Sequence, residues 1–221
     1  MPLLEHASDQ AKPAGGGKSV RRFFGFRRRG LLGGFLLAPC GLAAILSEPS
    51  ISEDGWLRLF LNATGWILFL LSVGIRVWAT LFVGGHKDKE LQTGGPYSIC
   101  RNPLYLGSFL FALSLSCFLE SATFAVALLS VFVIYSASVV PAEELSLEKR
   151  FEEDYRSYCL RAPRFWPRLS AFHSAPLVTV DLKRLKKEVI RLSRAALLVV
   201  ALQSVLQPRW ASWWPHWFNL P

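Results

Sequence analysis

The chain has 221 residues, of which 52% are hydrophobic, and these include 16 Phe and 8 Trp. A soluble domain of this length is usually less apolar, and aromatic residues are favoured at membrane interfaces, so the composition indicates an integral membrane protein. The formal charge of +9 would suit nucleic acid, but the basic residues cluster beside apolar runs, which favours contact with lipid headgroups and excludes a nucleic-acid partner. Cysteines are widely spaced and form no CxxC pair, which predicts no disulfide framework and no metal site.

The first half of the chain alternates polar and apolar segments. Residues 1–29 are predicted to form a flexible basic tail, and residues 30–47 a first membrane span that is retained rather than cleaved as a signal peptide. A long apolar run over residues 56–83 follows as the second span. Its interior Arg76 is expected either to snorkel to one end of the span or to face other helices.

The next two spans are predicted over residues 103–119 and 122–141. Only Glu120 and Ser121 separate them, which predicts an antiparallel helical hairpin. A polar helix over residues 143–160 follows on the cytoplasmic side, and its large apolar and aromatic residues recur at helical spacing: Leu147, Phe151, Tyr155 and Tyr158.

Residues 171–221 form a separate predicted region. A basic amphipathic helix over residues 182–194 runs into a fifth apolar segment over residues 195–206, and a Trp-rich end is typical of an interfacial anchor. The predicted fold class is therefore all-α: a multi-pass membrane protein with about five transmembrane helices and a C-terminal amphipathic helix.

Lys and Arg side chains predict the orientation of this protein in the membrane. They precede the first apolar run and follow the second and fourth, whereas the links after the first and third runs contain none. The positive-inside rule then places the N-terminus in the cytoplasm. It also places two polar segments, residues 95–107 and residues 141–144, on the same cytoplasmic face, where they could build one site.

The first of these segments combines turn signals with a helix start. Pro103 fits the first turn of a helix, and Arg101 together with free helix N–H groups would favour an anion such as a carboxylate or phosphate. The alternative is that Arg101 is only a positive-inside anchor and Pro103 only a cap.

The second segment carries adjacent carboxylates, Glu143 and Glu144. Neighbouring helix positions point about 100° apart, so one acid could face a cationic ligand while the other pairs with Arg101 or Arg164. The alternative is that both simply begin a surface helix, where acids suit the helix dipole.

Three motifs resemble those of a known family. The first is Gly95-Pro96-Tyr97-x-x-x-Arg101-Asn102-Pro103-x-Tyr105-x-Gly107; the second is Glu143-Glu144 followed by Phe151, Tyr155 and Tyr158; the third is Arg164-Phe165-Trp166-Pro167. Together they are similar to the signatures of the isoprenylcysteine carboxyl methyltransferases and the related phospholipid methyltransferases, which are small integral membrane enzymes. Asn102 stands where the prenylcysteine enzymes often have His, and Glu152 stands where a Gly commonly follows the Phe.

The resemblance implies S-adenosylmethionine as cofactor, an acceptor that enters from the lipid, and catalytic roles for Arg164 and Glu144. It further implies cofactor-binding roles for Tyr97, Arg101, Asn102, Pro103, Tyr105, Gly107, Glu143, Glu144, Tyr155 and Tyr158. The expected partners are membrane lipid and a lipophilic or lipidated acceptor, such as a prenylcysteine carboxylate, a lipid amine, or a small thiol or phenol. Alternatives are a membrane reductase using NADPH and a non-enzymatic protein that docks on anionic lipid.

Overall fold

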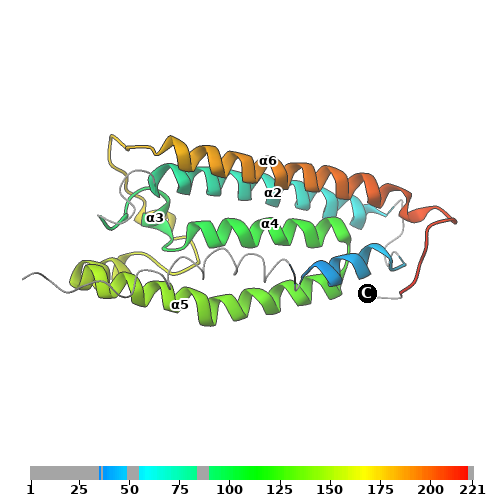
Figure 1. Cartoon of the computed structure of the whole chain (residues 1–221), viewed down its shortest axis with the longest axis horizontal. Coiled ribbons are helices and arrows are strands. Elements are labelled where there is room, and N and C mark those ends of the chain that lie inside the picture. The colour runs from blue at the N-terminus through cyan, green and yellow to red at the C-terminus, as the bar shows by residue number, and fades with distance from the viewer. Residues whose placement is uncertain (1–34, 36, 49–54, 84–89, 219–221) are drawn as a thin grey trace, which may run out of the picture. The chain divides into compact units, whose positions relative to one another are not determined.

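The computed structural model describes residues 35, 37–48, 55–83 and 90–218. The elements discussed below lie in one compact unit, Leu37–Pro221. Over the described residues this unit is helical and contains no strand, apart from an isolated bridge between Ser47 and Phe218. The all-α prediction is therefore confirmed. Figure 1 shows the helices running alongside one another.

Helices α2 (Trp56–Val83) and α4 (Pro103–Leu119) make the most extensive helix–helix contact. Their bounds coincide with the apolar runs of the sequence. Small residues allow the close approach, because a Cβ atom at Gly65 would lie 2.5 Å from the Phe118 ring. The Ser72 hydroxyl donates a 2.7 Å hydrogen bond to the Gly107 carbonyl, which ties the two helices together at a second point.

Helix α5 (Ala122–Arg161) begins after the tight link predicted between the hairpin helices. Glu120 adopts a left-handed conformation with φ 52°, and the Ser121 hydroxyl caps the new helix by accepting a hydrogen bond from Phe124 N at 3.2 Å. The sequence predicted a span followed by a separate cytoplasmic helix that begins at residue 143, but in the structure the first helical part of α5 continues through Pro141. The conformation departs from helical at Glu152 instead, where φ is 42° and ψ is −112°.

Helix α6 (Leu182–Leu206) joins the predicted basic stretch and the fifth apolar run into one element. The Asp181 carboxylate caps it by accepting hydrogen bonds from Lys183 N at 2.9 Å and Arg184 N at 3.2 Å. The helix packs on α2 and α4. It buries Val199 and Leu206 in the main apolar cluster, together with residues of four other helical segments: Ala44, Phe69, Phe118, Leu119 and Phe124.

Hydrogen bonds hold the Trp-rich end of the chain against the helices, although part of this end is exposed. Arg209, in the short helix η2 (Gln207–Trp210), is buried and donates to the carbonyl oxygens of Ser47 and Leu119 at 3.1 Å each. Trp214 Nε1 donates to the Ile45 carbonyl at 3.2 Å, whereas Trp213 remains exposed. The end therefore closes the bundle beside the α4–α5 link, a role that the expected interfacial anchor did not include.

Three described helices are long and apolar enough to cross a membrane: α2, α5 and the helical stretch Leu182–Arg209. Helix α4 is apolar but shorter, at 17 residues. Of the predicted first span, residues 37–45 are helical and most of the remainder lies outside the described residues, as does the basic tail. The chain is thus a helical protein with segments long and apolar enough to cross a membrane, and the count of about five spans stays a prediction.

The backbone at Glu152 yields a stability prediction. A non-glycine residue in this positive-φ region is strained by about 1–3 kcal/mol, so we expect Glu152→Gly to stabilise the protein by about 1 kcal/mol despite the greater freedom of glycine in the unfolded chain. Thermal unfolding in detergent would then shift upward by about 2–4 °C.

The neighbouring residue provides the matched control. Glu153 is exposed in regular helix, so Glu153→Gly should destabilise by about 1 kcal/mol. Equal losses of stability in both glycine variants would contradict the strain at Glu152.

Candidate functional site

Residues 93–102, directly before α4, fold as a turn, one short helix and an extended residue. Gly95 has φ 59°, a conformation that favours glycine, and a Cβ atom there would lie 2.3 Å from the Phe82 ring. Helix α3 (Pro96–Ile99) follows, Cys100 is extended, and Pro103 occupies the first turn of α4 as predicted. The segment therefore ends with Arg101 and Asn102 immediately before the apolar helix α4.

The chain that leaves α5 lies alongside this segment. Arg101 N donates to the Pro163 carbonyl at 2.8 Å, and Arg168 N donates to the Ile99 carbonyl at 3.0 Å. The Cys100 thiol, buried between them, points at the carbonyl oxygens of Arg164 and Phe165 at 3.5 and 3.4 Å. Burial raises the pKa of this thiol, although a backbone hydrogen bond with Asn102 and the Arg101 charge oppose the rise. Cys100 is therefore a protonated packing group at neutral pH and no nucleophile.

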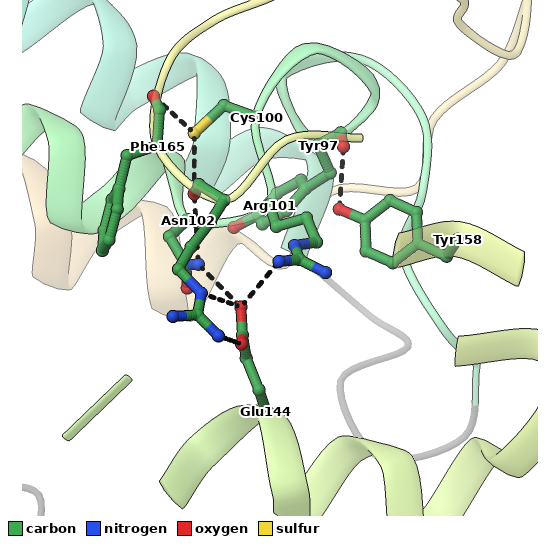
Figure 2. Close-up of polar contacts among 8 residues, drawn as sticks. Tyr97, Cys100, Arg101, Asn102, Glu144, Tyr158 and Phe165 are labelled. Atoms are coloured by element: carbon green, nitrogen blue, oxygen red, sulfur yellow. Dashed lines mark hydrogen bonds and ion pairs between the residues drawn. The ribbon is translucent and has the colours of Figure 1, made fainter. Parts of the chain in front are cut away.

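The Glu144 carboxylate joins the two polar segments, as Figure 2 shows. Arg164 donates to both of its oxygens, from Nη2 to Oε2 at 2.5 Å and from Nε to Oε1 at 3.2 Å. Arg101 Nη2 lies 3.5 Å from Oε1, and Asn102 Nδ2 donates to the same oxygen at 3.4 Å. The side chain of Glu144 is only 12% exposed, compared with 43% for Arg164. The carboxylate is thus partly withdrawn from solvent and neutralised by guanidinium groups from two different loops.

Asn102 precedes α4 in the N-cap position, yet its side chain makes no capping hydrogen bond. Its amide nitrogen instead donates to Glu144 and, at 3.2 Å, to the Arg164 carbonyl. Asn102 therefore connects α4, α5 and the chain that follows α5.

Arg101 has further hydrogen-bonding capacity. Among the described residues, none accepts a hydrogen bond from its buried Nε atom. A buried guanidinium donor without a protein partner is costly unless another group satisfies it. Arg101 is thus the strongest candidate in this cluster for contact with an anionic ligand.

The predicted tyrosines lie next to this cluster. The Tyr158 hydroxyl donates a 2.7 Å hydrogen bond to the Tyr97 carbonyl, and Tyr155 and Tyr158 are buried with ring centroids 6.1 Å apart. Burial of the Tyr97 hydroxyl raises its pKa, so that it stays protonated at neutral pH. Tyr97, Arg101 and Tyr158 share the lining of a small cavity of about 150 Å³ with Phe151.

A larger cavity of about 560 Å³ lies on another side of Tyr158. Among the described residues that line it, none is acidic, while Arg161, Arg168 and His173 are basic. The rest of its polar lining consists of hydroxyl groups from Thr93, Ser98, Tyr158 and Ser170. This cavity was not predicted from the sequence, although the Arg residues on both sides of Pro163 were a signal for it.

The remaining predicted residues lie around rather than inside the Glu144 cluster. Pro103 is buried at the start of α4, and Tyr105 and Glu143 are half-buried on α4 and α5. Gly107 faces α2, where an added Cβ atom would lie 2.5 Å from Arg76 Cγ. Their contact with a cofactor stays a prediction. Among the described residues, no group of three or more His, Cys, Asp or Glu side chains is arranged to hold a metal ion.

Comparison of the sequence with known proteins identifies the family of this chain. The family model described as phospholipid methyltransferase matches residues 60–154, which include α3, α4, Arg101 and Glu144. The chain belongs to this family. The family points to a methyltransferase, and the apolar helices long enough to cross a membrane indicate that it is a membrane protein.

Curated relatives extend the similarity over most of the chain. The nickel-cobalt-cadmium resistance protein NccN of Alcaligenes xylosoxydans xylosoxydans is 31% identical over 180 residues, which cover 81% of this chain and 84% of NccN. The cobalt-zinc-cadmium resistance protein CzcN of Cupriavidus metallidurans is 29% identical over 187 residues, or 85% of each chain. No solved structure matches.

The Glu144 cluster predicts an unequal response to the loss of two nearby acids. Glu144→Ala leaves Arg101 and Arg164 without their shared carboxylate, so we expect a loss of about 2 kcal/mol of stability. Glu148→Ala, which breaks only the exposed pair with Arg156, should change stability by about 0.5 kcal/mol or less. Thermal unfolding of both variants in the same detergent measures the difference, and equal melting temperatures would contradict a structural role for Glu144.

Proposed function

We propose that the protein transfers a methyl group from S-adenosylmethionine to a lipid-soluble acceptor, at a site on the cytoplasmic side of the membrane. The observation that carries this proposal is the partly buried Glu144 carboxylate facing Arg101 and Arg164, in a chain of the phospholipid methyltransferase family. Glu144 and Arg164 are the proposed catalytic residues, and the Arg101 segment is the proposed wall of the cofactor site.

The residues present suit the charged end of this cofactor, which carries an ammonium and a carboxylate. Arg101 offers the carboxylate a guanidinium whose buried Nε has no acceptor among the described residues. Glu144 offers the ammonium a carboxylate, and its most exposed partner, Arg164, is the one that an incoming cation would displace. When bound, the cofactor supplies a methyl group already activated by a positively charged sulfur.

Because the donor arrives activated, these residues need to supply little proton transfer. Their proposed work is to orient the donor and to exclude water, and well-oriented reactants gain much of their rate from position alone. The pairing of Glu144 with Arg101 and Asn102 supports this role, because a carboxylate that these two residues hold from the segment before α4 keeps its position when the ligand displaces Arg164. Tyr97 and Tyr158 would close the site, since both line the small cavity beside Arg101.

The larger cavity supports an acceptor that carries an acidic group. Its volume of about 560 Å³ falls in the range of small-molecule sites, about 300–1,000 Å³. Arg161, Arg168 and His173 would attract a carboxylate or a phosphate. A prenylcysteine-like carboxylate or a phosphate-bearing lipid amine suits this lining better than a neutral thiol or phenol.

The same basic lining favours one alternative function. A cluster of guanidinium groups would also suit the 2′-phosphate of NADPH, as a membrane reductase would require. The family membership favours the methyl donor over the dinucleotide. A non-enzymatic protein that docks on anionic lipid would bind neither ligand.

Ligand binding separates these functions. Purified protein in detergent is heated with S-adenosylmethionine, its demethylated product or NADPH; a ligand at 100 times its dissociation constant stabilises by about 2.7 kcal/mol. We expect the methyl donor and its product to raise the melting temperature and NADPH to leave it unchanged. Arg101→Ala and Glu144→Ala should abolish the shift, whereas Glu148→Ala should retain it. A shift with NADPH alone would favour the reductase, and retained donor binding in both site variants would refute the site.

A link to metal resistance is the second part of the proposal, because two relatives that cover most of the chain carry metal-resistance names. The prediction is that cells producing the wild-type protein grow at higher nickel, cobalt or cadmium concentrations than cells producing Glu144→Ala at equal membrane levels. Glu148→Ala serves as the matched control and should protect like the wild type. Equal growth of wild-type and Glu144→Ala cells would show that the site has no part in resistance.

A further inference from the structure

A buried ion pair connects α6 to α2 behind the start of α4. Arg76 of α2 contacts Glu188 of α6 through two nitrogens, Nε at 2.7 Å and Nη2 at 2.6 Å from Oε1. The two side chains are only 12% and 5% exposed. Arg191, one turn along α6, also pairs with the second Glu188 oxygen. Arg76 therefore faces other helices, which was one of the two placements expected for it.

This pair lies where charge is costly. Both side chains are nearly buried inside the protein, and buried charged groups are tolerated when they pair with each other. Loss of one partner would leave the other buried and uncompensated, whereas replacement of both by apolar residues is often neutral for stability. The pair therefore contributes little net stability, and its role lies in the groups that it holds in place.

The free side of the Arg76 guanidinium reaches α4. Its Nη1 atom donates to the Leu104 carbonyl at 3.2 Å and to the Ser108 hydroxyl at 2.5 Å. Ser108 in turn donates to the same Leu104 carbonyl at 2.9 Å. The arginine stem passes directly over Gly107, where a Cβ atom would lie 2.5 Å from Arg76 Cγ. One guanidinium therefore holds α6 on one side and the first turns of α4 on the other.

The first turn of α4 directly follows the residues that approach Glu144. Asn102 accepts a 3.0 Å hydrogen bond from Leu106 N through its carbonyl, while its side chain donates to Glu144. A rotation or shift of this turn would therefore move Asn102, and with it Arg101, relative to the carboxylate. Arg76 holds this turn through its hydrogen bonds to Leu104 and Ser108.

We propose that Glu188 and Arg76 are positioning residues: through them, α6 sets the geometry of the Arg101–Asn102 segment against Glu144. The positioning of a methyl donor in particular rests on the function proposed above. Glu188 lies outside residues 60–154 that the family model matches, so this assigns a task to the C-terminal helix, a part of the chain with no counterpart in the motifs of the resemblance.

The test removes the pair without leaving a buried charge. The double variant Arg76→Met/Glu188→Met is compared with wild type. Glu188→Gln is the second variant: it keeps the shape of the side chain and an oxygen that can accept from Arg76, but removes the negative charge. Arg194→Gln removes an exposed charge from the same helix and is the matched control. Hydrogen–deuterium exchange is followed over residues 103–109, with residues 122–134 of α5 as an internal reference. The dissociation constant of the demethylated product of S-adenosylmethionine is measured on the same samples.

We expect the double variant to keep its melting temperature within a few degrees, to exchange about tenfold faster over residues 103–109, and to bind the product about tenfold more weakly. Glu188→Gln should change both quantities in the same direction but less, and it decides the question if the double variant does not fold. Arg194→Gln should change neither.

Two results would overturn the proposal. Unchanged exchange over residues 103–109 in the pair variants would show that Arg76 does not hold the start of α4, whatever ligand the site takes. Faster exchange with unchanged product affinity would show that the held turn does not position the site. Failure of the wild-type protein to bind the product is a different result: it would refute the methyl-donor function, while the exchange data would still decide whether the ion pair orders the segment.

Discussion

The pairing of Glu144 with guanidinium groups is the interaction on which the described site depends. A carboxylate at the polar end of an apolar helix bundle is costly unless donors satisfy it, and Glu144 is only 12% exposed. Its partners come from the segment before α4 and from the chain after α5, so one charge brings together parts of the sequence that are far apart. The backbone bond from Arg101 N to Pro163 O reinforces the same junction without adding charge.

This constraint explains local choices that would otherwise weaken the fold. Asn102 stands in an N-cap position yet gives its amide to Glu144 and the Arg164 carbonyl, leaving the first N–H groups of α4 without a side-chain cap from it. Pro103 lowers the cost, because it has no N–H to satisfy. The helix start is thereby organised for the site, and the fixed turn of α4 that follows is secured from the other side by Arg76.

The sequence predicted the parts of this arrangement that depend on apolar runs or on the distribution of charged residues. The apolar runs of the sequence lie where the structure has α2 and α4, and the structure brings the segment of residues 95–107 next to Glu144. The membrane face on which both lie stays a prediction. The continuity of α5 through Pro141 was missed because a proline and a change to polar composition predict a boundary, whereas a long helix tolerates both when its neighbours satisfy the freed carbonyl. The partner of Arg76 could not be predicted: Glu188 is 112 residues away, and although it is the single acid between residues 182 and 206, the sequence does not indicate that α6 packs on α2.

The two departures from the family pattern now have different physical meanings. Glu152 takes a positive φ where the family commonly has Gly, so the bend in α5 is kept at the expense of backbone strain. Asn102 replaces the frequent His with a neutral amide that still donates to Glu144, so the hydrogen bond is kept and a titratable group is lost. Neither change removes the carboxylate–guanidinium core. Selection among acceptors would then rest with the larger cavity, whose basic and hydroxyl lining comes mainly from α5 and the chain that follows it and does not include Asn102.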